Sequence, residues 1–94
     1  MVIRIGEFRA AEGEGQALHQ FLLSLAPYIT ASKGCLAYEV LRQQDNNDLF
    51  AVIERWQSIE DHRASVNGFP VDEMQAAMSL FASPPKGTYY YGDG

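Results

Sequence analysis

Two neighbouring segments of the chain are apolar on both sides when they are written as β-strands. In residues 34–41, Leu36, Tyr38 and Val40 fall on one face, and Cys35, Ala37 and Leu41 on the other. In residues 49–58, Leu49, Ala51 and Ile53 oppose Phe50, Val52 and Trp56. An antiparallel hairpin with one solvent-exposed face alternates apolar and polar residues. These two segments do not alternate in this way, so we expect both faces of the sheet to be buried. A chain of 94 residues has helix enough for one face, so we expect a second copy of the chain to cover the other.

Size and charge narrow the class of protein. The length predicts a single domain over residues 1–94, with a modest core that gains from burial in an oligomer. The net charge is −5, from 12 acidic and 7 basic residues without a basic cluster, which argues against a nucleic-acid partner. The single cysteine, Cys35, excludes an internal disulfide and is expected to be a small buried hydrophobe. Apolar runs far shorter than ~20 residues predict no membrane span, and the strand-like start predicts a cytoplasmic protein.

The remaining pattern predicts two helical regions and two further strands. Residues 2–8 form a strand, and residues 11–15 form an acidic turn before a helix that Pro27 bends and Gly34 ends. After the hairpin, Ser58 and Asp61 resemble the cap of a short helix that runs to about residue 66. A second helical piece spans residues 71–81, and a last strand spans residues 88–91.

The resulting order β-α-β-β-α-β is typical of a ferredoxin-like α+β fold. In that fold a four-stranded antiparallel sheet carries its helices on one face. The other face is then left for a dimer partner.

The quoted residues carry a family resemblance. The segment Gly34-Cys35-Leu36-Ala37-Tyr38-Glu39-Val40, followed by Phe50 and by Glu54-Arg55-Trp56-Gln57-Ser58 before a helix, resembles the antibiotic biosynthesis monooxygenase family. The resemblance covers nearly the whole chain and implies a dimeric α+β barrel. It also implies one of three activities: quinol oxidation, oxidation of polycyclic aromatic intermediates without metal or flavin, or haem degradation.

The branches differ at single positions. The haem-degrading branch uses an asparagine in the first strand and a histidine in the last helix, where this chain has Gly6 and a residue near Glu73. Haem degradation is therefore disfavoured. The branch acting on polycyclic aromatics has a polar ring-bearing residue six positions after its tryptophan, and His62 stands there. That branch also has an asparagine shortly before the tryptophan, and this chain has Val52 at the corresponding position.

An oxygenase of this kind needs few residues and, by the resemblance, no cofactor and no metal. A deprotonated quinol or phenol can pass an electron to O₂ itself, so the protein has to bind it, deprotonate it and exclude water. His62 is the candidate base, because a helix start favours the neutral imidazole, although Glu60 and Asp61 oppose this. An aromatic ring is expected in an apolar pocket with Trp56 as one wall, lined further by Phe21, Leu22, Met74, Met78 and Phe81.

Each candidate also has a plainer interpretation. Trp56 is equally expected as core, and His62 as a solvated first-turn residue. Met74 and Met78 are often core filler, and His19 is expected at the surface. Glu54 either enters the cavity or pairs with an arginine such as Arg4 or Arg55, and pairing is favoured over catalysis.

Two functional classes remain open. The first is a cofactor-independent monooxygenase acting on a small quinol or related phenol with O₂, with His62 and Trp56 as catalytic residues. The second is a non-catalytic module of the same fold that binds or protects a small molecule. An enzyme that uses His62 predicts an activity limb that rises near neutral pH and is lost in His62→Ala.

Overall fold

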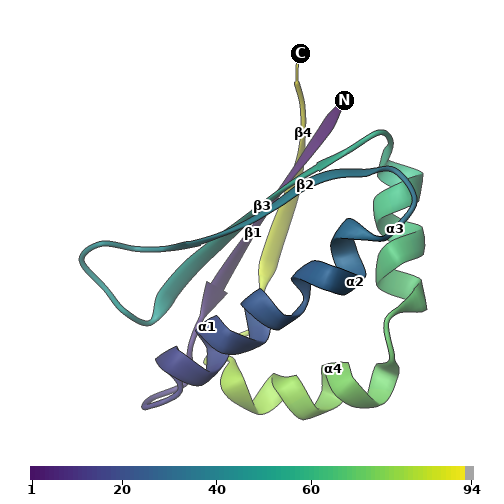
Figure 1. Cartoon of the computed structure of the whole chain (residues 1–94). Helices are drawn as coiled ribbons and strands as arrows, with labels where there is room; N and C mark the ends of the chain where they lie inside the picture. The colour runs from purple at the N-terminus through teal and green to yellow at the C-terminus, as the bar shows by residue number, and fades with distance from the viewer. Residues whose placement is uncertain (93–94) are drawn as a thin grey trace.

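The computed structural model describes residues 1–92 and has a four-stranded sheet with all helices on one face (Figure 1). The strands are β1 (Val2–Arg9), β2 (Cys35–Arg42), β3 (Leu49–Trp56) and β4 (Lys86–Tyr91). They are ordered β2-β3-β1-β4, and each neighbouring pair is antiparallel. This arrangement confirms the predicted ferredoxin-like α+β fold.

The first helical region is two helices where the sequence predicts one bent helix. Helix α1 spans Gly15–Ser24, and α2 spans Ala26–Thr30, with Pro27 in its first turn. Proline has no backbone N–H and its ring clashes with the carbonyl four residues earlier, so a helix interior is interrupted there while a first turn tolerates it. The interruption leaves α1 with its own buried stripe, and Leu18 and Leu22 are 0% and 1% exposed.

The second helical region begins as predicted and ends earlier. The Ser58 hydroxyl accepts the Asp61 backbone N–H at 3.1 Å and caps helix α3 (Ile59–Gly68). Helix α4 (Val71–Ala77) then gives way to the 3₁₀ turn η1 (Met78–Leu80). Phe81, predicted as the last helical residue, has extended backbone and forms a β-bridge with Ala10.

Alternation along the strands divides the sheet into a helix-covered face and an open face. On the covered face, Phe50 and Val52 of β3 pack with Leu18 and Leu22 of α1 in the buried core. The neighbouring residues Ala51 and Ile53 point the other way, as do their cross-strand partners Glu7 and Ile5. Within residues 1–92, no helix lies on this second face (Figure 1).

Candidate active site between the sheet and the helices

One row of side chains crosses the helix-covered face and includes a residue from every strand. The register aligns Tyr38 of β2 with Glu54 of β3, Glu54 with Arg4 of β1, and Arg4 with Tyr89 of β4. Directly opposed residues of antiparallel strands have neighbouring side chains. The first turn of α3 adds His62, which contacts both Tyr89 and Glu54, while the Tyr38 hydroxyl at the other end of the row donates to the Leu22 carbonyl.

His62 is held inside this cluster and is 7% exposed. Its Nδ1 lies 2.6 Å from the Tyr89 hydroxyl, and its Nε2 lies 3.9 Å from Glu54 Oε1. Its ring packs edge-on against Trp56 at 5.4 Å and against Tyr89 at 5.3 Å between ring centroids. The structure therefore places His62 in the interior and not, as the plainer interpretation had it, in solvent.

The surroundings keep the His62 imidazole neutral. Burial is the largest cause that lowers its pKa, to about 4, and the positive charges of Arg4 and Arg63 lower it further. The sequence predicts the same neutral form from the position at a helix start. In the folded protein, burial against the sheet dominates instead.

Glu54 enters the cavity and is the second titratable group of the cluster. Its Oε1 accepts the Trp56 Nε1–H hydrogen bond at 2.8 Å. Burial raises the pKa of its carboxyl, while the Trp56 hydrogen bond and the Arg4 charge act in the lowering direction. Among residues 1–92, no ion pair within 4.0 Å joins Glu54 to Arg4 or Arg55, so the predicted pairing with an arginine is limited to the longer-range charge of Arg4 on the adjacent strand. Burial raises the pKa of Glu54 and lowers that of His62, so in both groups it favours the neutral form.

Arg4 is packed against strand β4. Its guanidinium carbon lies 4.8 Å from the centroid of the Tyr89 ring, which is a cation–π distance. The guanidinium also covers Gly87, where a Cβ atom would overlap it. Glycine at this position therefore makes room for the arginine.

A cavity of about 590 Å³ separates the sheet from the helices and exposes this cluster at its wall. Its polar lining includes Arg4, Glu54 and His62. All five residues predicted to bind substrate line it as well: Phe21, Leu22, Met74, Met78 and Phe81. The volume is in the range of small-molecule sites, and the mixture of apolar walls with a few converging polar groups is typical of them.

Trp56 differs from the expectation, because it does not line this cavity. Its side chain is fully buried and lies behind Glu54 and His62, touching the first through a hydrogen bond and the second through its ring. The indole is therefore a support for the two titratable groups and not a wall against the ligand.

Sequence reasoning missed Arg4 and Tyr89 as members of the site. The alternation of β1 puts Arg4 on the face of Gly6 and Phe8, which is a signal that the sequence does contain. The pairing of Arg4 with Tyr89 depends on the register of two strands separated by about the whole chain, and no local pattern specifies it.

The positions that set apart the haem-degrading branch have no iron ligand here. Gly6 lines the cavity without a side chain, and Glu73 lies outside its lining. His19 stacks on Phe50 at 5.5 Å, away from the cavity. In the part of the chain that the structure describes, no group of three or more His, Cys, Asp or Glu side chains is placed to hold a metal ion.

Cys35 lies outside the lining of this cavity, and its thiol is not activated. Burial raises the pKa of the Cys35 thiol, which is the opposite of what a reactive thiolate needs. None of the helices within residues 1–92 has the length and apolarity to cross a membrane.

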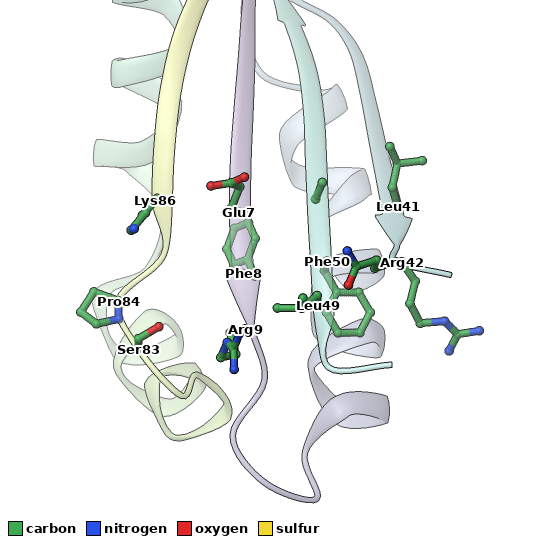
Figure 2. A pocket seen from close by; sticks show the side chains of 12 residues that line it. Glu7, Phe8, Arg9, Leu41, Arg42, Leu49, Phe50, Ser83, Pro84 and Lys86 are labelled. Atoms are coloured by element: carbon green, nitrogen blue, oxygen red, sulfur yellow. The ribbon is translucent and has the colours of Figure 1, made fainter. Parts of the chain in front are cut away.

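A second hollow of about 590 Å³ lies at the end of the sheet where β1 ends and β4 begins (Figure 2). Side chains from all four strands and the segment before β4 line it, among them Glu7, Arg9, Leu49 and Lys86. Its lining is charged but contains neither His62 nor Glu54, the two groups whose pKa values burial shifts in the first cavity. The cavity on the helix-covered face is therefore the candidate active site.

The fold and this cavity define a small ferredoxin-like α+β domain with a ligand-sized chamber. The model of the antibiotic biosynthesis monooxygenase family matches residues 1–79. The chain belongs to that family.

Solved structures show the same fold at low sequence identity. PA3566 from Pseudomonas aeruginosa is 23% identical with a TM-score of 0.87, and the match covers 99% of this chain and 94% of that one. A Deinococcus radiodurans protein that carries the family's name is 24% identical with a TM-score of 0.86, covering 100% and 94%. SnoaB from Streptomyces nogalater, a cofactor-independent oxygenase solved as a mutant, is 15% identical with a TM-score of 0.82, covering 99% and 93%. No curated protein sequence matches the chain.

Proposed function

We propose that the protein is a cofactor-independent monooxygenase that oxidises a small quinol or related aromatic phenol with O₂. One observation carries the proposal: Glu54 and His62, two titratable groups whose pKa values burial shifts, meet at the wall of a largely apolar cavity. Perturbed titratable groups in a ligand-sized cavity are a physical signature of proton-transfer sites. Membership of the family and the likeness to SnoaB favour the same class.

In the proposed reaction the protein prepares the substrate for O₂. His62 takes the phenolic proton as a neutral imidazole, and Glu54 at 3.9 Å stabilises the imidazolium that forms. Phe21, Met74 and Met78 bind the ring and exclude water. Trp56 holds Glu54 in place through its indole N–H. The electron-rich anion then passes one electron to O₂, and the substrate radical and superoxide combine at a ring carbon that bears hydrogen. The peroxide takes back the proton from the His62 imidazolium, and loss of water from the hydroperoxide leaves one oxygen atom on the substrate as a carbonyl while the other leaves in the water.

The same proposal includes a homodimer formed through the open face. The centre of that face is aliphatic, with Ile3, Ile5, Ala51 and Ile53 on two adjacent strands. Covering these side chains stabilises the sheet by burying apolar area. The cytoplasmic location expected from the sequence stays a prediction.

The test is O₂ uptake by the purified, metal-free protein with reduced quinols and anthrone-type phenols, corrected for autoxidation. We expect uptake above background that falls at least roughly 10²-fold in His62→Ala, as for the loss of a general base. Trp56→Phe, which removes the hydrogen bond to Glu54, should cause a smaller loss, and His19→Ala is the matched control outside the cavity. The rising limb of the pH profile should lie near the His62 pKa of about 4, and not near neutral pH as the sequence suggests.

A non-catalytic binding module is the second candidate, and one observation favours it. An imidazole whose pKa is about 4 is a weak proton acceptor at neutral pH, and its Nδ1 is already engaged by Tyr89. Background uptake with every substrate, together with ligand binding that needs no O₂, would favour the binding module over the enzyme.

A further inference from the structure

The Arg4 guanidinium lines the cavity, and the proposed deprotonation does not use it. Arginine stays charged at all working pH values, so this wall of an apolar chamber carries a permanent positive charge. Across residues 1–92, its side chain has neither a carboxylate within 4.0 Å nor a hydrogen-bond acceptor of its own. Its neighbours in these residues are the Tyr89 ring and, beyond 4.0 Å, the Glu54 carboxyl on the adjacent strand, so the hydrogen-bond donors of the guanidinium remain for a ligand to use.

Strand β4 fixes the position of this charge. The guanidinium occupies the space that a side chain at Gly87 would take, and it lies over the ring of Tyr89. The Tyr89 hydroxyl in turn forms a hydrogen bond of 2.6 Å with His62 Nδ1. The arginine is therefore oriented by its neighbours before any ligand arrives, which lowers the entropy lost on binding.

We propose that Arg4 is the receptor for an anionic group and that the cavity takes a flat aromatic molecule carrying an oxyanion, either a carboxylate or a phenolate. The planar guanidinium matches the two oxygens of a carboxylate and also binds a single oxyanion. The apolar side chains of Phe21 and Met78 lie in the same lining and accept the ring. The inference rests on the proposed function in that it names the substrate class for the same cavity.

The neighbouring charges make this site sensitive to pH. The charged and titratable groups around the guanidinium are Glu54 on β3, His62 and Arg63 on α3, and Lys86 and Tyr89 on β4. Ionised Glu54 opposes a bound anion, and burial raises the pKa of this carboxyl. Anion binding therefore favours protonated Glu54, so affinity increases as pH falls through its raised pKa.

The experiment is isothermal titration calorimetry with 2-naphthoate and its neutral isostere 2-naphthamide at neutral pH, and with 2-naphthol at neutral and alkaline pH. We expect 2-naphthoate to bind more tightly than 2-naphthamide. In Arg4→Gln the affinity for 2-naphthoate should fall roughly 10- to 100-fold, as for the loss of a charged hydrogen bond, while 2-naphthamide changes less than about 3-fold. Arg42→Gln removes the same charge at an exposed position outside this cavity and is the matched control.

Two further variants separate the charge from its placement. Arg4→Lys keeps the charge without the planar fork, and should recover part of the lost affinity. Gly87→Ala keeps Arg4 but puts a Cβ into the guanidinium's space, so it should weaken 2-naphthoate binding selectively. Circular dichroism shows whether each variant is folded, and Gly87→Ala keeps the test decisive if Arg4→Gln does not fold.

Arg4 dependence with 2-naphthoate identifies a carboxylate as the anion, whereas dependence confined to 2-naphthol at alkaline pH identifies a phenolate. The inference is overturned if neither oxyanion depends on Arg4, that is, if 2-naphthoate and 2-naphthamide bind equally or lose equal affinity in Arg4→Gln and 2-naphthol at alkaline pH also binds independently of Arg4. It is likewise overturned if neither oxyanion binds at millimolar concentration. Binding that depends on Arg4 without O₂ uptake by any substrate leaves the inference standing and rejects the oxygenase.

Discussion

The two faces of the sheet differ in charge at its middle. Arg4 and Glu54 lie side by side in the middle of the face that the helices cover. Ile5 and Ile53, each the neighbour of one of these residues in the chain, lie side by side on the face that no helix in the described residues covers, although this face also carries charges farther out, such as Glu7. A monomer of ordinary design has its charges outside and its aliphatic residues inside. The local inversion at the middle of the sheet supports the two proposals above, a ligand on the covered face and a second copy of the chain on the open face.

The largest effect is expected at the centre of the open face. Ile53→Lys places a charge among aliphatic residues, and burying it in the proposed dimer costs several kcal/mol. We expect dissociation of the dimer to become at least roughly 100-fold more favourable, measured by sedimentation equilibrium at micromolar concentration.

Val66→Lys is the matched control for this change. Val66 is 56% exposed on helix α3, away from the open face, and a lysine there should leave the oligomer intact. If the wild-type protein is a monodisperse monomer, the comparison of the two faces loses its basis.

The next effect comes from the covered face and is a pH dependence of stability. His62 has a pKa of about 4 in the folded protein against 6.5 as its ordinary value, so between these values the unfolded chain binds a proton that the folded chain does not. The free energy of unfolding should therefore fall as pH decreases from 6.5 to 4, by up to roughly 3 kcal/mol.

Urea unfolding of the wild type and of His62→Gln at several pH values measures the contribution of His62. Between pH 6.5 and 4, the free energy of unfolding of His62→Gln should depend less steeply on pH than that of the wild type. His19→Gln removes the other histidine and should keep the wild-type pH dependence. A wild-type slope that survives unchanged in His62→Gln would place the acid sensitivity elsewhere.

The smallest effect concerns Glu54. Because its folded pKa is raised, the stability that it contributes is present below its unfolded pKa and is lost as pH rises through the folded value. Glu54→Gln keeps an oxygen for the Trp56 indole and removes the buried charge. We expect it to raise the free energy of unfolding at pH 7 by about 1 kcal/mol, with the gain absent in acid.

Urea midpoints at pH 7 and in acid measure this gain, and Glu12→Gln, at an exposed turn, is the control. A Glu54→Gln protein that is less stable than the wild type at pH 7 would mean that the carboxylate is stabilised by its surroundings, contrary to its burial.

The sequence predicted the fold well because its strongest signals are local. The apolar strand predicted within residues 49–58 and the cap at Ser58 each depend on a few neighbouring residues, and both are confirmed. The end of the second helical region was placed too late because the stripe through Phe81 has helical spacing, whereas Phe81 is drawn into an extended bridge with Ala10. Long-range pairing overrode the local pattern there.

The candidate site was predicted in part. The five apolar residues expected around a ligand lie together on the cavity wall, since amphipathic stripes specify which side of each helix faces the sheet. The sequence left open whether Trp56 is core or pocket wall, because spacing shows that an aromatic residue faces inward but not how deep it lies. The side chain is behind the site, where it supports Glu54.

By itself, the sequence determined the elements and their order, because hydrophobic periodicity and turn chemistry act over short distances. That both faces of the sheet are covered stays a prediction. Only the tertiary structure decided that Arg4, Glu54, His62 and Tyr89 meet. Their proximity depends on the register of three strands and the docking of α3, and these are settled by the packing of the whole core. The same packing removes water from the cluster, and this burial shifts the pKa values on which the proposed chemistry depends.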